Sequence, residues 1–194
     1  MESRLITDIS EINSLYDFIR TQNLNYPQYD EWAKKCRDEL LTGYKKAFAM
    51  IVAGKNREPI VVGSIIAQPH KKDPSVLELK NGRVHTQYAK KGCFKNIYLD
   101  VERYARENGY RKILLDAHAD NFEMISLMQK LGYIIECREN LYTNKSLELV
   151  MTKDLSLTKL QTLEMVVIDS ARKAMMKIRL LMMKFLKVIL IKNE

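Results

Sequence analysis

A glycine turn between a predicted strand and a predicted helix is the feature that most constrains the fold. Residues 76–84 alternate in part as a strand does, and residues 95–107 carry apolar side chains at helical spacing. Between them lies the turn AKKGCF (89–94), with Gly92 at its centre and two lysines beside it. The first N–H groups of a helix lack hydrogen-bond partners, and the helix dipole favours an anion there. We therefore expect this turn to bind a phosphate group.

The remaining hydrophobic pattern predicts an α/β (α+β) domain built on one mixed sheet. Apolar residues at helical spacing predict the helices, and short apolar runs bounded by Gly, Pro or Asn predict the strands. The expected order is a strand, two helices, three strands, a helix, a strand, a helix and two final strands. The predicted helices cover residues 10–19, 31–41, 95–107 and 121–131, and the predicted strands cover residues 4–7, 47–53, 60–68, 76–84, 112–117, 133–137 and 147–152.

A change in composition predicts a domain over residues 1–154 and a basic amphipathic helical extension over residues 155–194. The extension contains no Gly or Pro, and its eight Lys/Arg against three Asp/Glu give it a net charge of +5 out of +8 for the chain. Its apolar residues are too interrupted by charge to span a bilayer. They form a heptad-like seam made of Ala171, Ala174, Ile178, Leu181, Phe185 and Val188.

Three uses of the extension remain open. It can pair with a second subunit or pack on the domain, it can lie on an anionic membrane surface, or it can bind nucleic acid. We expect a homodimer to which this helix contributes, because so many apolar side chains would not stay exposed to water. A membrane surface or nucleic acid is expected as a partner only through the extension.

Composition also limits the setting of the protein. The chain is 46% hydrophobic and 29% charged, which argues against a membrane-embedded body. Cys36, Cys93 and Cys137 are odd in number and lack the spacing of a metal or redox site. With no signal-peptide pattern in MESRLITDIS, we expect a reduced, cytoplasmic protein without a metal.

The stretch VHTQYAKKGCFKNIYLDVERYARENGYRKILL, followed by NFEMISLMQKLGY, resembles the GNAT superfamily of acyl-CoA-dependent N-acyltransferases. The resemblance is best over residues 84–133, and the predicted order of elements extends it to about residues 4–154. It implies a GNAT-like mixed, mostly antiparallel central sheet flanked by helices. It also implies an acyl-CoA cosubstrate, by default acetyl-CoA, and an amine acceptor that is a small molecule or a peptide.

In that family, backbone amides around the turn bind the pyrophosphate of coenzyme A, and the preceding strand pairs with the pantetheine arm. Of the family's turn pattern, Gly92 matches, whereas Ala89 and Phe94 depart from it. Phe94 puts a side chain where the backbone approaches phosphate, and the neighbouring lysines could supply charge. The cofactor-binding residues that the resemblance implies are Val84, Lys90, Lys91, Gly92, Cys93, Phe94, Lys95 and Asn121.

Met128 stands seven residues after Asn121, where many family members have a tyrosine that protonates the departing thiolate. A thioether cannot donate a proton. One interpretation is an active enzyme in which Ser126 or Tyr142 supplies the hydroxyl, since a thiolate leaves readily and acyl transfer depends mostly on proximity. The other is a non-catalytic acyl-CoA-binding sensor or assembly module.

Glu78 is the general base that the resemblance implies, because family members often carry a base on the strand before the turn. The alternative is a solvated strand residue. Asp116 and His118 end the next predicted strand, and a lone loop histidine is usually only exposed to solvent. Cys93 has no His–acid partner nearby and is expected to be a small half-buried thiol.

Aromatic residues between the first two helices occupy the region that roofs the acceptor site in the family. The resemblance implies substrate-binding roles for Tyr26, Tyr29 and Trp32, with negative charge from Asp30 and Glu31 to hold an amine. The alternative is that the aromatic rings simply pack the helix pair on the sheet.

Overall fold

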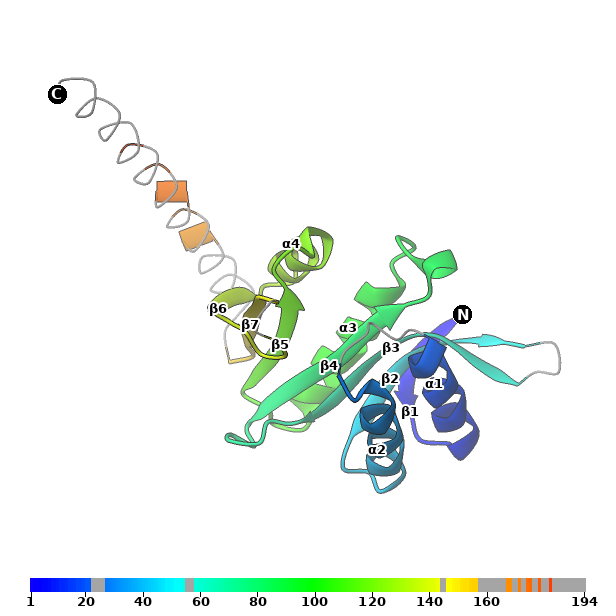
Figure 1. Ribbon diagram of the computed structural model, residues 1–194. Coiled ribbons are helices and arrows are strands. Elements are labelled where there is room, and N and C mark those ends of the chain that lie inside the picture. Colours follow the sequence, from blue (N-terminus) through cyan, green and yellow to red (C-terminus); the bar gives the residue numbers. More distant parts are fainter. Residues whose placement is uncertain are drawn as a thin grey trace.

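The computed structural model describes residues 1–21, 27–54, 58–143 and 146–156, together with seven single positions between residues 167 and 182. In this part the chain forms a seven-stranded sheet of order β1-β2-β3-β4-β5-β7-β6. Its neighbouring strands are antiparallel except for the parallel pair β4 and β5. Helices cover both faces of the sheet (Figure 1), so the predicted mixed, mostly antiparallel sheet flanked by helices is confirmed.

The elements follow the predicted order, with one short 3₁₀ helix added. The strands are β1 (Glu2–Ile6), β2 (Lys46–Ala53), β3 (Pro59–Pro69), β4 (Val76–Val84), β5 (Lys112–His118), β6 (Ile134–Glu139) and β7 (Glu148–Asp154). The helices are α1 (Ile9–Thr21), α2 (Tyr29–Leu41), the 3₁₀ helix η1 (Thr86–Tyr88), α3 (Cys93–Glu107) and α4 (Phe122–Lys130).

Helix starts are where prediction and structure differ. Helix α1 begins at Ile9, so Ser10 lies inside the helix and is not its N-cap as predicted. The N–H of Ile12 donates to the carbonyl of Asp8 at 2.9 Å, which places the first turn two residues earlier than the prediction. Helix α2 likewise begins at Tyr29, two residues before the predicted start, and its first turn closes where the Trp32 N–H donates to the Gln28 carbonyl at 3.0 Å.

The core divides into two clusters, one on each face of the sheet. Side chains alternate along a strand, so Phe48 and Met50 of β2 join the cluster under α3 and α4, whereas Ala47 and Ala49 join the cluster under α1 and α2. Burial of both faces explains why the central strands are continuous apolar runs.

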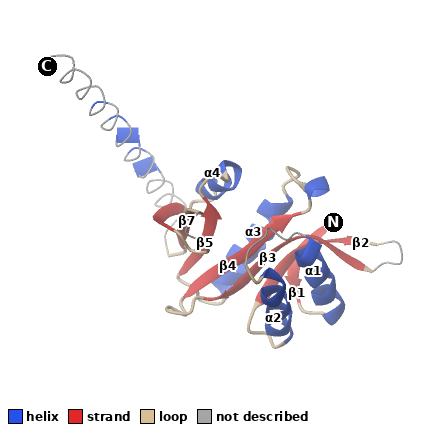
Figure 2. Cartoon of the chain, viewed as in Figure 1, coloured by secondary structure: helices blue, strands red, loops and turns tan. Residues whose placement is uncertain are grey.

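The parallel strands β4 and β5 separate after a short ladder. Val76 to Leu79 of β4 pair with Lys112 to Leu115 of β5. Beyond Leu79, β4 continues beside β3, while β5 continues beside β7 to its end at His118. The two strands therefore diverge between α3 and α4 (Figure 2).

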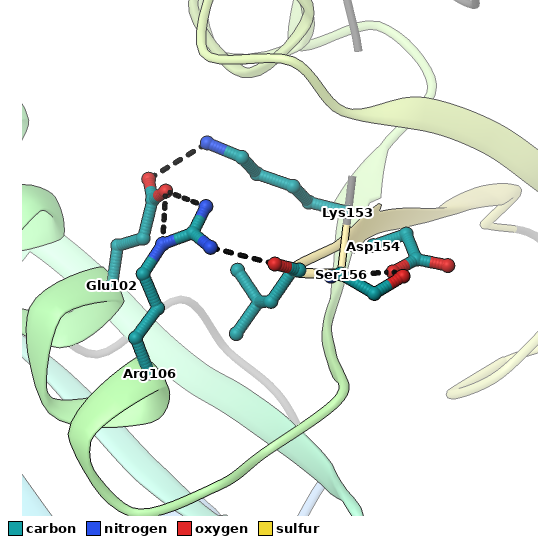
Figure 3. Close-up of polar contacts among 6 residues, drawn as sticks. Glu102, Arg106, Lys153, Asp154 and Ser156 are labelled. Carbon is teal, nitrogen blue, oxygen red and sulfur yellow. Dashed lines mark hydrogen bonds and ion pairs between the residues drawn. The ribbon is translucent and has the colours of Figure 1, made fainter. Parts of the chain in front are cut away.

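An ion-pair network joins the end of β7 to α3 (Figure 3). Lys153 Nζ lies 2.7 Å from Glu102 Oε2, and the Arg106 guanidinium donates to Glu102 Oε1 at 2.8 Å. Arg106 Nη1 also donates to the carbonyl of Leu155 at 2.6 Å. The start of the extension is thereby tied to α3.

Most of the predicted extension lies outside the described residues, so the division at residue 154 stays a prediction. Of the predicted seam, Leu181, Phe185 and Val188 lie outside that part of the chain. The described positions are helical and exposed, and they are Val167, Ile168, Ala171, Ala174, Met175, Ile178 and Met182. No helix among the described residues is both long and apolar enough to cross a bilayer.

Glu102 is the residue on which the junction depends. Burial alone would raise the pKa of Glu102, but hydrogen bonds from Lys153 and Arg106 outweigh burial and lower it. Such a carboxylate stabilises the fold above its unfolded-state pKa of about 4.3. That contribution is lost as the pH falls through the lower folded-state pKa.

We expect Glu102→Ala to lower the free energy of unfolding by about 2 kcal/mol at neutral pH, because Lys153 is left buried without its partner. The variant should also lose less stability than the wild type on acidification from about pH 5 to about pH 3. Urea denaturation of the full chain at several pH values measures both effects. Glu107→Ala, an exposed position of the same helix, is the control and should change stability by less than about 0.5 kcal/mol. Equal losses in the two variants would contradict the prediction.

Candidate functional site

A pocket of about 630 Å³ lies where β4 and β5 separate. Its walls come from both strands, from the start of α2, from α3 and α4, and from the segment between β6 and β7. A concave site between diverging strands is a common location for a ligand.

The alternation of strand side chains gives the pocket two chemically different halves. Leu79 and Leu115 belong to the core cluster under α3 and α4, and they meet Phe94, Tyr98 and Met128 in an apolar half. The other half contains the next residue of each strand together with the start of α2. Its members are Lys80, Asp116, Tyr29, Trp32 and Tyr142. The pocket therefore passes through the sheet from an apolar side to a charged side.

A β-bulge in β4 determines which residues reach the charged side. Ser64 and Ile66 of β3 are two residues apart, but their partners Arg83 and Lys80 are three residues apart. The extra residue lies at Asn81–Gly82, and Asn81 has a left-handed backbone with φ of 50°. The bulge shifts the alternation by one residue, so Lys80 and Arg83 both face α2.

Contacts on either side of the bulge confirm this shift. The Arg83 guanidinium lies 5.6 Å from the centre of the Tyr29 ring in α2. Gly82 faces the opposite way, and a Cβ at that position would lie 3.0 Å from Cε2 of Phe94 in α3. The Phe94 ring therefore packs over Gly82 and forms part of the pocket wall.

A polar network lies at the point where the two strands part. Lys80 Nζ lies 2.9 Å from Asp116 Oδ1 and 3.0 Å from Glu78 Oε1. The Tyr142 hydroxyl donates to Asp116 Oδ2 at 2.8 Å, and Gln68 Nε2 donates to Glu78 Oε2 at 2.8 Å. The network joins three strands, β3, β4 and β5, to the segment before β7.

The network also sets the protonation of its members. Burial opposes the charge on Lys80, but Asp116, Tyr142 and Glu78 outweigh burial and raise the pKa of Lys80. Burial raises the pKa of Tyr142, and the neighbouring Asp116 raises it further. Lys80 is thus an ammonium and Tyr142 a neutral phenol at neutral pH.

The turn before α3 leaves the first backbone amides of the helix without intrahelical partners. Gly92 is the N-cap, with a left-handed φ of 79° and no side-chain hydrogen bond. The Asn96 N–H donates to the Gly92 carbonyl at 3.0 Å, and this is the first hydrogen bond of the helix from residue i to residue i−4. The amides of Cys93, Phe94 and Lys95 come before it and have no such partner in the helix. A Cβ at Gly92 would meet no atom within 4 Å. The space in front of the turn is open.

The lysines of the turn are exposed. Lys90 Nζ lies 3.2 Å from Glu123 Oε1, and both side chains are at least 80% exposed. Lys91 Nζ lies 5.7 Å from the centre of the Tyr88 ring. Lys95 is also exposed. These weak contacts leave the three ammonium groups available to an anion.

Over residues 12–133 the sequence matches the model of the acetyltransferase (GNAT) family. The chain belongs to this family. Membership makes acyl transfer from an acyl-CoA to an amine the class of reaction. No curated protein sequence matches the chain significantly.

Solved structures agree in fold with this GNAT domain. An N-acetyltransferase from Staphylococcus aureus aligns with a TM-score of 0.63 at 16% identity, over 80% of this chain and 99% of its own. The Escherichia coli ribosomal-protein-S18-alanine N-acetyltransferase aligns with a TM-score of 0.61 at 16% identity, over 81% of this chain and 96% of its own. An aminoglycoside 6'-N-acetyltransferase complexed with coenzyme A aligns with a TM-score of 0.62 at 17% identity, over 80% of this chain and 97% of its own. At these identities the likeness shows the fold.

Several residues predicted for cofactor binding lie near the pocket of this GNAT domain. Val84 ends β4 and pairs with Gly63 of β3. Asn121 lines the pocket and caps α4, where its Oδ1 accepts from the Met124 N–H at 3.2 Å. Cys93 is 2% exposed, so this thiol is more deeply buried than predicted.

The catalytic candidates separate into two groups. Tyr142 and Met128 line the pocket, and the Met128 side chain is buried. Ser126 is exposed beside a different surface hollow and is not among the pocket-lining residues. Glu78 reaches the site through Lys80 and does not itself line the described pocket. His118 lines the pocket, with its side chain 44% exposed.

Tyr29 and Trp32 both pack in the domain and line the pocket, so their substrate-binding role stays a prediction. Tyr29 is buried against α1, where its hydroxyl donates to the carbonyl of Ile19 at 3.1 Å, and it also lines the pocket. Trp32 lines the pocket as well, with its ring centre 5.5 Å from that of Tyr29. Tyr26 lies outside the described residues.

Sequence reasoning missed Lys80, Asn81 and Arg83. The signal was the Asn-Gly pair inside a strand, because this dipeptide is typical of a turn or bulge rather than of regular pairing. Asp116 was noticed only as the end of a strand, since its neighbours come from distant segments.

Proposed function

We propose that the protein is an N-acyltransferase that transfers an acetyl group from acetyl-CoA to an amine by direct attack in a ternary complex. The observation that carries the proposal is the pocket through the sheet at the separation of β4 and β5. A carboxylate–phenol network lies at that separation, and Phe94, two residues after the open turn at Gly92, lines the pocket. Donor and acceptor can enter such a pocket from opposite faces and meet at its centre.

The residues present fit a coenzyme A donor. The amides of Cys93, Phe94 and Lys95 would hold the pyrophosphate, with Lys90, Lys91 and Lys95 adding charge. Phe94 is compatible with this because its ring packs over Gly82 and borders an open pocket. The unpaired edge of β4 up to Val84 would receive the pantetheine amides, and its N–H groups would polarise the thioester carbonyl.

Asp116 and Tyr142 supply the proton transfers in this proposal. Asp116 lines the pocket and takes the proton of the attacking amine as the new amide bond forms. The Tyr142 hydroxyl gives its proton to the departing thiolate and is reprotonated by Asp116 across their 2.8 Å hydrogen bond. The net result is one proton moved from amine to thiolate. Glu78 stays a predicted base that would act through Lys80 or water.

Met128 favours a second candidate function, a non-catalytic acyl-CoA sensor or assembly module. Its buried thioether lies in the pocket wall and cannot donate a proton. Turnover separates the two functions, because the module would bind acetyl-CoA without releasing thiol in the presence of any amine.

We expect the purified full chain to release free thiol from acetyl-CoA with members of a panel of amines. Asp116→Asn and Tyr142→Phe should each lower kcat by about 10- to 100-fold without weakening acetyl-CoA binding. The measurements are thiol release and the Kd for acetyl-CoA. Tyr44→Phe, at an exposed position away from the pocket, is the matched control and should keep full activity. Binding of acetyl-CoA without thiol release from any amine would favour the sensor.

Gly92 and Gly109 offer a matched test of the turn. Both have a left-handed φ, of 79° and 73°, and a Cβ at either would meet no atom within 4 Å. Gly92→Ala and Gly109→Ala should therefore each cost about 1 kcal/mol of stability. Only Gly92→Ala should weaken coenzyme A binding, by about 10-fold, because it alters the backbone that faces the pyrophosphate. Calorimetric Kd values check this, and equal Kd values for the two variants would argue against the turn as the binding site.

We also propose a homodimer to which the extension contributes. Of the predicted seam, Ala171, Ala174 and Ile178 lie among the described residues, and all three are exposed. Ile168, Met175 and Met182 add apolar surface beside this seam and are between 52% and 65% exposed. A second copy of the helix would cover them. A membrane surface or nucleic acid would be an alternative partner of the extension.

Sedimentation equilibrium of the full chain should give twice the monomer mass of 22.7 kDa. Ile178→Lys should shift the mass toward the monomer, because a charge in the seam opposes pairing. Tyr44→Lys is the control on the domain surface and should leave the mass unchanged. A monomeric wild-type chain that binds anionic vesicles or DNA would replace the dimer with one of the alternative partners.

A further inference from the structure

We propose that the acceptor carries a carboxylate next to its amine, as a free α-amino acid does, and that Arg83 binds this carboxylate with help from the charge of Lys80. The inference rests on the proposed acyl transfer and specifies its acceptor. It comes from the charged half of the pocket, which faces α2.

The bulge in β4 is the first support. In a regular strand Arg83 would face away from Lys80, but the extra residue at Asn81–Gly82 puts both cations on one side of the pocket. A left-handed backbone at a non-glycine residue costs free energy, and such strain concentrates at functional sites. The consequence of this strain is a second positive charge beside the point where the strands part.

The balance of charge is the second support. The described lining residues include three basic side chains, Lys35, Lys80 and Arg83, and two acidic ones, Glu31 and Asp116. Each oxygen of Asp116 already accepts a hydrogen bond, from Lys80 or from Tyr142. Asp116 and Glu78 already offset the charge of Lys80. Among the described lining residues, an acceptor with several positive charges would therefore meet Arg83 and Lys35 with only Glu31 to hold it. An acceptor with one amine and one carboxylate matches this half of the pocket.

We assign the main contact to Arg83 because of the geometry of its guanidinium, and Lys80 contributes only charge from its place between Asp116 and Glu78. A guanidinium binds a carboxylate through two parallel N–H donors, which fixes orientation as well as position. The side-chain oxygen of Asn81, next to Arg83, is buried and has no hydrogen-bond partner among the described residues. The acceptor amine is a donor that could satisfy it once bound.

The aromatic wall selects the rest of the acceptor. Tyr29, Trp32 and Tyr142 border the same half of the pocket. Rings of this kind contribute apolar surface against a flat or bulky side chain. We therefore choose phenylalanine as the probe, and phenylalanine amide as its matched partner without the carboxylate charge.

The test compares kcat/KM for phenylalanine and phenylalanine amide with acetyl-CoA as donor. We expect phenylalanine to be preferred by about 10-fold or more. The amine of phenylalanine amide is less basic and is therefore more often in the neutral, nucleophilic form, which by itself favours the amide. A preference for phenylalanine therefore reports the contact with its carboxylate. Equal rates, or a preference for the amide, would overturn the proposal.

Variants at Arg83 sharpen the test. Arg83→Gln should remove the preference by slowing the reaction of phenylalanine while leaving that of the amide within about twofold, and Arg83→Lys should restore part of it. Lys34→Gln removes an exposed charge outside the pocket lining and is the control that should keep the preference. Equal loss for both acceptors in Arg83→Gln would overturn the role of Arg83.

A binding measurement separates this proposal from the proposed function. Calorimetry on the full chain saturated with coenzyme A should show phenylalanine binding about 10-fold more tightly than its amide, whether or not turnover occurs. Discrimination in binding without thiol release would count against acyl transfer and for the acceptor site. If acetyl-CoA releases thiol with other amines while phenylalanine and its amide bind equally, acyl transfer is supported and the proposed acceptor site is overturned.

Discussion

The early end of the ladder between β4 and β5 is the constraint on which the rest of the site depends. The two strands pair only over Val76–Leu79 and Lys112–Leu115, and each then keeps its other neighbour in the sheet. Among the described residues, no ladder pairing joins the two strands beyond Leu79 and Leu115. In the proposed function, the amide groups of the pantetheine arm would pair with the edge of β4 at this place.

The same divergence brings together side chains that are far apart in sequence. Lys80 and Asp116 meet because the strands are parallel neighbours at the point of separation, and Tyr142 reaches them from the segment before β7. Tyr142 brings a phenol to the pocket from a different part of the chain than Met128, which stands where the family resemblance leads one to expect a tyrosine. In the proposed function this hydroxyl, which donates to Asp116, would protonate the departing thiolate.

The element order could be predicted from the sequence because burial on both faces of the sheet makes each strand and helix periodic. The turn at Gly92 was also predictable, since its backbone needs a residue without a Cβ penalty. The charged half of the pocket was not. Its members depend on the bulge at Asn81 and on pairing across 36 residues, from Lys80 to Asp116, and neither leaves a local periodic signal. Of the residues assigned by resemblance, the described pocket lining includes Tyr29, Trp32, Phe94, Asn121 and Tyr142, and the roles of all of them stay predictions.

Helix α3 serves two ends of the molecule. Its first turn follows Gly92, and its last turns hold the start of the extension through Glu102 and Arg106. A straight helix of this kind transmits displacement along its axis, since its backbone hydrogen bonds resist stretching. A force applied to the C-terminal segment is therefore borne by the element that presents the anion-binding amides. In the proposed dimeric acyltransferase, partner binding through the extension and nucleotide binding at the turn would therefore depend on one helix.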